Sequence, residues 1–113
     1  MRIITQQVTA DELRRMAAAT FGDMVKAVVD VERELLAIDG DLHSDLEAFL
    51  IENGSKRQDL WGINLYMELA GDDFVEFDSM INMRPSQGNR SRGVESPQTR
   101  EKIMQIVAKR IQR

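Results

Sequence analysis

The sequence predicts an α+β fold, a two-layer domain in which a mostly antiparallel sheet of about five strands packs against three helices. Two pairs of segments alternate apolar and polar residues across short turns, which is typical of antiparallel hairpins. Three other segments repeat apolar residues at helical spacing and begin at N-capping residues. At 113 residues the chain can bury one hydrophobic core, so we predict a single domain over residues 1–113.

The first two elements are a short strand and a helix. Residues 2–8 are rich in Ile, Thr and Val and alternate weakly, which favours a strand. Thr9 and Glu12 have the spacing of a capping box, in which each side chain accepts from the other's backbone amide. Apolar residues then follow at helical spacing, and Gly22 can supply the left-handed conformation that ends a helix.

A hairpin and a second helix follow. Residues 24–31 and 34–38 read as two antiparallel strands, although the turn between them lacks an Asn-Gly pair. Leucine and phenylalanine at helical spacing predict a helix from about Asp41 or Ser44 to Asn53, ended by Gly54. Ser44 and Glu47 could form its capping box. A hairpin turn through Asn53 and Gly54 is the alternative.

The clearest hairpin joins residues 60–69 to residues 74–83. Because side chains alternate between the faces of a strand, the apolar set that includes Trp61 and Phe77 is predicted to face the core. Five polar side chains are predicted to share the opposite face: Asn64, Tyr66, Glu76, Asp78 and Asn82.

A third helix begins at Ser96, with Pro97 at its first position. Its narrow apolar stripe consists of Ile103, Ile106, Val107 and Ile111. The predicted order of elements is therefore β-α-β-β-α-β-β-α, with no internal repeat.

The composition excludes several classes of protein. The chain has no cysteine, which excludes disulfides, thiolate metal sites and cysteine nucleophiles. The N-terminus lacks the apolar run of a signal peptide, and no segment approaches the roughly 20 apolar residues of a membrane span. We therefore expect a cytoplasmic protein with no membrane partner.

The charge is distributed unevenly. Residues 1–83 carry seven basic and seventeen acidic side chains, a net charge of −10, whereas residues 84–113 carry eight and two, a net charge of +6. The basic segment could contact an anionic partner, or it could lie on the protein's own acidic surface. Nucleic acid is an unfavoured partner, because the sequence pI is near 5.0 and the polar sheet face offers only one aromatic ring for stacking.

An arginine-rich loop over residues 83–93 is the leading candidate for a binding site. Guanidinium groups, hydroxyls and flexible backbone amides suit a phosphate or carboxylate group, although no Walker A or dinucleotide motif is present. The predicted anion-binding residues are Arg84, Ser86, Asn89, Arg90 and Arg92. The alternative is that these side chains pair with carboxylates of the protein itself.

Two alternatives to an anion-binding module stay open. One is a structural or homodimeric module that associates through the polar sheet face or the last helix. The other is a divalent-metal-dependent hydrolase that uses Glu76 and Asp78, with His43 as a further candidate. No nucleophile–base constellation and no metal-binding motif is visible, so we favour a protein that is not an enzyme and needs no cofactor. His43 itself is best explained as a residue at a helix start.

Three segments carry a resemblance to a known family: residues 59–66 (DLWGINLY), residues 76–79 (EFDS) and residues 81–93. They resemble an uncharacterised family of small bacterial and archaeal proteins of unknown function, over nearly the whole chain. The resemblance implies a free-standing small domain and assigns no catalytic residue.

Overall fold

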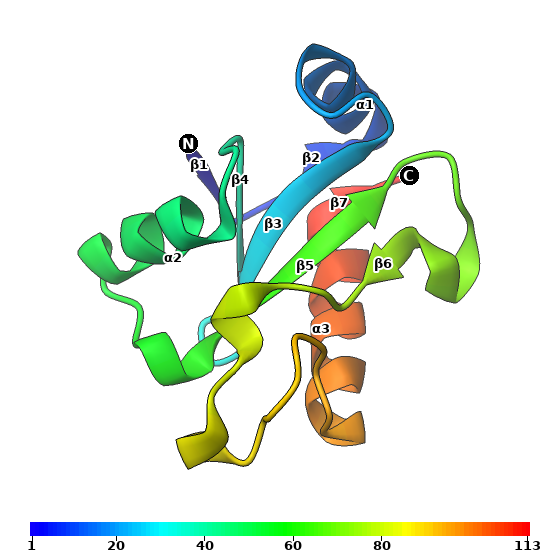
Figure 1. Cartoon of the computed structure of the whole chain (residues 1–113). Coiled ribbons are helices and arrows are strands. Elements are labelled where there is room, and N and C mark those ends of the chain that lie inside the picture. The colour runs from blue at the N-terminus through cyan, green and yellow to red at the C-terminus, as the bar shows by residue number, and fades with distance from the viewer.

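A five-stranded antiparallel sheet forms the centre of the molecule, with strand order β1-β4-β3-β5-β6 (Figure 1). The computed structural model describes all of residues 1–113. The strands are β1 (Arg2–Ile4), β3 (Met24–Asp30), β4 (Leu35–Ile38), β5 (Leu60–Tyr66) and β6 (Val75–Glu76). The predicted α+β class, with five antiparallel strands and three helices, is confirmed.

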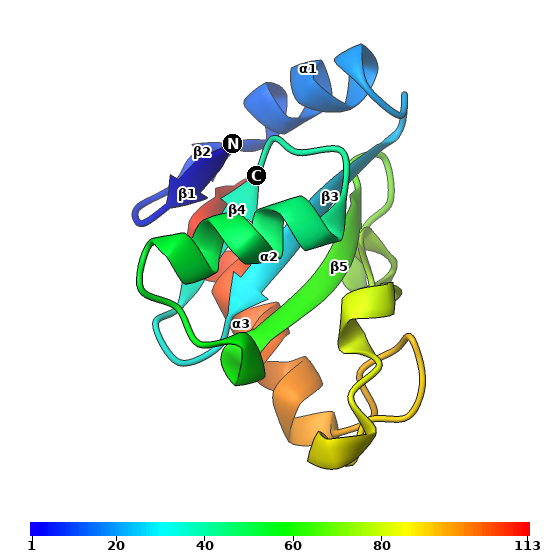
Figure 2. The same ribbon diagram turned by 60° about the vertical axis from the view of Figure 1, so that its left-hand side comes forward.

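The three helices lie on both faces of this sheet. They are α1 (Ala10–Ala19), α2 (His43–Glu52) and α3 (Pro97–Arg110). Figure 2 shows α2 in front of the sheet and α3 behind it. The arrangement thus has one layer more than the two expected, because α2 packs on the face opposite to α1 and α3.

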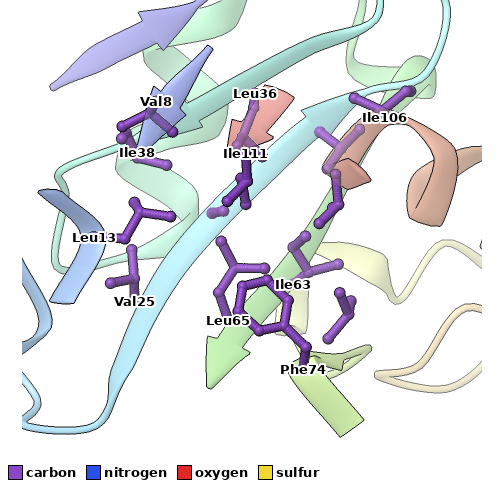
Figure 3. Packing of buried hydrophobic residues seen from close by; sticks show 14 of the residues in the cluster. Val8, Leu13, Val25, Leu36, Ile38, Ile63, Leu65, Phe74, Ile106 and Ile111 are labelled. Carbon is purple, nitrogen blue, oxygen red and sulfur yellow. The ribbon is translucent and has the colours of Figure 1, made fainter. Parts of the chain in front are cut away.

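Two apolar clusters separate the layers. The larger one joins the sheet to α1 and α3 and includes Leu13, Ile63 and Ile106 (Figure 3). The smaller one lies under α2 and includes Val28 and Leu46. Trp61 belongs to the larger cluster, as its position in the alternating pattern predicts.

A second, two-stranded sheet pairs the two ends of the chain. Strand β2 (Val8–Thr9) lies parallel to β7 (Ile111–Gln112). The predicted first strand over residues 2–8 is therefore two strands in different sheets. Ile111 belongs to β7 and not to the apolar stripe of the last helix, because α3 ends at Arg110.

At two of the three predicted helix starts the N-cap side chain accepts a hydrogen bond from a backbone amide as expected, although the Glu12 side chain binds Arg2 and does not complete the capping box at Thr9. The Thr9 hydroxyl accepts from the Glu12 amide at 3.1 Å, and the Ser96 hydroxyl accepts from the Thr99 amide at 3.2 Å. The Ser44 capping box is wrong, because α2 begins at His43 with Leu42 at the N-cap and no side-chain cap. Asn53 and Gly54 end α2, so the alternative hairpin does not form.

The predicted strand over residues 74–83 is correct only at its start. Its partner β5 pairs with Val75 and Glu76 alone. The chain then leaves the sheet because the Ser79 amide donates to Arg92 O and the Ser79 hydroxyl caps a 3₁₀ turn, Met80–Asn82. This departure places the arginine-rich loop beside the start of β5, where Arg84 contacts Arg57 O and Leu60 O.

Candidate functional site

Helix α2 covers only part of its sheet face, and the uncovered part is polar. On this face Lys26 of β3 lies opposite Asn64 of β5, and Asn64 lies opposite Glu76 of β6. Tyr66 follows Asn64 on the same side of β5. We call Lys26, Asn64, Tyr66, Glu76 and Asp78 the polar patch. The structure brings together four of the five residues predicted for the polar sheet face.

Hydrogen bonds fix the centre of the polar patch. Asn64 Nδ2 donates to Glu76 Oε1 at 2.9 Å and to Asp78 O at 3.2 Å, and Tyr66 donates to Glu76 Oε1 at 3.3 Å. Partial burial and the Glu76 carboxylate raise the pKa of the Tyr66 hydroxyl. Asn64 Oδ1 is buried without a donor. The patch therefore contains one buried acceptor that has no hydrogen-bond partner.

Asn82 is the exception, because it lies in the interior and not on the polar face. Its side chain is fully buried, accepts from Gly62 N at 2.8 Å and donates to Gly62 O and Arg92 O at 3.0 Å each. An amide side chain thus pairs with β5 as a neighbouring strand would. The prediction that Asn82 shares the polar face of the sheet is wrong, because the chain has left the sheet and formed the 3₁₀ turn.

Gly62 leaves the space in which two polar side chains meet. A Cβ atom at this position would lie 2.6 Å from the Ser79 Cβ and Oγ atoms and 3.2 Å from His43 Cγ. Glycine within a strand often marks such a close approach. Ser79 and His43 therefore both lie over Gly62 in the middle of β5, on the sheet face that also carries Asn64.

His43 is the first residue of α2 and is buried, with 8 % of its surface exposed. Its Nε2 atom donates to Ile63 O at 2.8 Å, whereas Nδ1 has no hydrogen bond. Burial lowers the pKa of the imidazole, and the positive charges of Lys26 and Arg92 act in the same direction. The bond to Ile63 O and the Asp78 carboxylate oppose this shift. Burial, the largest of these effects, therefore favours the neutral imidazole.

A cavity of about 240 Å³ opens where α2 begins. We call it the α2 pocket. Its lining residues are Lys26, Leu42, His43, Ser44, Ser79, Met80, Ile81 and Arg92. The backbone amides of His43 and Ser44 have no acceptor, because α2 lacks a side-chain cap. Uncapped amides at a helix start attract anions.

Two cations border the α2 pocket. Arg92 Nε donates to Asp78 Oδ1 at 2.6 Å, and its terminal nitrogens make no hydrogen bond. Lys26 has no ion pair, and its ammonium lies 5.4 Å from the centre of the Phe21 ring. One cation is thus balanced by a carboxylate and the other is not. The pocket has one unbalanced positive charge.

Arg84, the first predicted anion-binding residue, is bound within the protein. It donates to Leu60 O and, at 2.6 Å, to Arg57 O, and its guanidinium lies 4.2 Å from the centre of the Trp61 ring. Its Nε atom is buried without a partner. Arg84 therefore seals the outer edge of β5 and is not available to a ligand.

Asn89 and Glu95 also hold the arginine-rich loop. The buried Asn89 side chain donates to Asn82 O and Gly93 O at 2.7 and 2.8 Å. The Glu95 carboxylate accepts from the backbone amides of Arg90 and Ser91, which lowers the pKa of Glu95. The carboxylate of Glu95, two residues beyond the loop, thus already binds two backbone amides that could otherwise bind an anion.

The five predicted anion-binding residues do not converge on one place. Ser86 and Arg90 have no side-chain hydrogen bond, and Ser86 is exposed. Only Arg92 reaches the α2 pocket. Several residues at the α2 pocket were therefore not predicted as site residues from the sequence: Lys26, Gly62, Ser44 and Ser79. A lysine within an otherwise valine-rich strand was the one visible signal.

Most of the basic segment lies on the protein's own surface. Arg100 donates to Val94 O, Arg110 to Thr5 O and Glu34 O, and Arg113 to Leu69 O. Lys102 and Lys109 both bind the Glu34 carboxylate, at 2.8 and 2.7 Å. Of the two explanations for the charge asymmetry, these contacts favour internal pairing.

Replacing Glu34 by glutamine should remove an acid-sensitive part of the stability. Hydrogen bonds from Lys102 and then Lys109 lower the pKa of Glu34 from 4.5 to about 2. A carboxylate with a lowered folded-state pKa stabilises fully above its unfolded pKa and loses this effect as pH falls. We expect the melting temperatures of wild type and Glu34→Gln to differ above pH 4.5 and to converge towards pH 2. Glu32→Gln, in the same turn and without an ion pair, is the control, and a constant difference would contradict the assignment.

The structure gives no support to a metal-dependent hydrolase. No group of three or more histidine or carboxylate side chains lies close enough to hold a metal ion. Glu76 is bound by Asn64 and Tyr66, and Asp78 by Arg92.

None of the three helices has the length and the apolar composition that a membrane-spanning helix needs.

The comparisons with known proteins identify a family. The model of the family "Protein of unknown function (DUF5674)" matches residues 2–110, so the chain belongs to this family. Neither the curated proteins nor the solved structures give a significant match. The predicted membership of an uncharacterised family is thereby confirmed.

Proposed function

We propose that this member of the DUF5674 family binds a small organic anion, with a phosphate or carboxylate group, in the α2 pocket. The observation that carries the proposal is the convergence of Lys26, Arg92 and the uncapped start of α2 on one cavity. Charge-assisted hydrogen bonds of this kind are the strong ones in proteins. The Ser44 and Ser79 hydroxyls add neutral donors.

The size and the rim of the pocket limit the ligand. About 240 Å³ lies below the roughly 300–1,000 Å³ of pockets for drug-sized ligands. Leu42 and Met80 at the rim are 53 % and 63 % exposed, which provides an apolar surface for the carbon part of a ligand. These features favour a small organic anion over a dinucleotide or a nucleic acid.

Replacing Lys26 by methionine should weaken binding of a small phosphomonoester about tenfold or more, because a hydrogen bond to a charged group contributes about 1.5–3 kcal/mol. The fold should be little affected, because Lys26 has no ion pair and the variant removes only its cation–π contact with the Phe21 ring. Isothermal titration calorimetry of wild type and variant with propyl phosphate measures the change.

Two controls match this variant. Lys56→Met removes the same charge from an exposed position outside the α2 pocket, and Arg90→Ala removes an unpaired arginine two residues from Arg92. Both should bind like wild type. Equal affinity of the Lys26→Met protein, or no binding by wild type, would contradict the proposal.

A further inference from the structure

We infer that the anion bound in the α2 pocket carries a hydroxyl or N–H group close to its charged group, and that His43 Nδ1 accepts a hydrogen bond from it. This inference rests on the proposed function and specifies the ligand of the same site. It starts from one nitrogen, His43 Nδ1, which can only accept a hydrogen bond and lies among pocket groups that can all donate one.

The hydrogen bond at Nε2 determines which ring nitrogen of His43 carries the proton. Ile63 O can only accept, so Nε2 must donate across the 2.8 Å that separates them. In a neutral imidazole the other nitrogen, Nδ1, is then an acceptor. Burial and the nearby Lys26 and Arg92 keep the ring neutral by lowering its pKa.

The protein leaves the Nδ1 atom of His43 without a hydrogen-bond partner. No protein group donates to it, and His43 lines the α2 pocket with Ser79, which is 1 % exposed. A bare carboxylate or fully ionised phosphate would bring only lone pairs towards this nitrogen. A ligand with an O–H or N–H group beside its anionic group would satisfy the cations and the acceptor together.

The acceptor at His43 Nδ1 makes the α2 pocket more selective than a site that only donates hydrogen bonds to an anion. Lysine, arginine, serine and backbone amides all donate, and they would bind any anion of suitable size. An acceptor among them discriminates, because a ligand without a donor leaves it unpaired. Hydroxylated phosphomonoesters and hydroxycarboxylic acids are the classes that fit.

A matched pair of ligands tests the inference. Glycerol 3-phosphate and propyl phosphate have the same phosphate and the same three-carbon chain, and they differ in two hydroxyls. We expect wild type to bind glycerol 3-phosphate about fivefold tighter, which is the effect of one net neutral hydrogen bond. The preference should persist in His43→Gln, which keeps a donor for Ile63 O and an acceptor, and vanish in His43→Phe.

Nuclear magnetic resonance gives a readout that needs no variant, because His43 is the only histidine of the chain. A long-range ¹H–¹⁵N spectrum should show the neutral tautomer with the proton on Nε2. The Nδ1 resonance should shift with glycerol 3-phosphate and stay unchanged with propyl phosphate. A proton on Nδ1 in the free protein would overturn the inference.

The outcomes separate the two proposals. If both phosphates bind with equal affinity and Lys26→Met weakens both, the anion site stands and the role of His43 is overturned. If neither phosphate binds, the proposed function itself is contradicted.

Discussion

Replacing Gly62 by alanine is expected to lower the free energy of unfolding by about 1–3 kcal/mol, the usual effect of overpacking a filled interior. The added Cβ would lie 2.6 Å from Ser79 Cβ and Oγ, closer than packed atoms approach. Ser79 cannot move away freely, because its amide is bonded to Arg92 O and its hydroxyl to the Ile81 amide. Urea denaturation of wild type and variant measures the loss.

The Gly62 substitution has a matched control and a rescue. Gly93→Ala adds the same methyl group where the nearest atom, Phe77 O, is 3.4 Å away, so it should change stability by less than about 0.5 kcal/mol. Removing the Ser79 side chain in Gly62→Ala/Ser79→Gly should restore part of the stability, because the clash disappears. An unchanged double variant would show that Ser79 is not the obstacle.

Replacing Asn82 by leucine should lower the free energy of unfolding by about 3 kcal/mol, because it leaves two buried backbone groups unpaired at about 1–3 kcal/mol each. These groups are the N–H and C=O of Gly62, whereas the C=O of Arg92 loses one donor and keeps the Ser79 amide. Leucine has a similar volume, so the loss would reflect hydrogen bonding more than packing. Chemical denaturation measures it, and a loss below about 1 kcal/mol would contradict the bonding role.

Two further measurements isolate the role of Asn82. Asn53→Leu removes an exposed asparagine whose side chain bonds only within its own helix end, so it should have a much smaller effect. Amide hydrogen exchange at Gly62 should accelerate in the Asn82 variant, since the Asn82 carbonyl oxygen is the acceptor of that amide.

Local patterns in the sequence predicted most of the fold. The Thr9 and Ser96 caps, the alternation along β5 and the glycine after α2 are signals read from neighbouring residues, and each has the expected structural result. The layer occupied by α2 was not predictable in this way. Helical periodicity shows that one side of a helix is buried, but it does not show which face of the sheet buries it.

The candidate site was harder to predict because long-range contacts decide it. The alternation of residues 74–83 favours a strand, yet the pairing of the Ser79 amide with Arg92 O ends it after Glu76. Arg84 and Arg92 look alike in the sequence, but one contacts backbone carbonyls and Trp61 and the other borders the α2 pocket. No local sequence pattern distinguishes the buried position of Arg84 from the position of Arg92 at the pocket.

The outer edge of β5 is covered along most of its length, and this has a consequence for association between molecules. Exposed strand edges are templates for aggregation and for strand addition by partners. Here β6 covers Asn64, the Asn82 side chain covers Gly62, and Arg84 covers Leu60 O. The opposite edge is β1, only three residues long. Two copies of this chain therefore have no long edge along which to join their sheets, and a homodimer would have to form through helices or sheet faces.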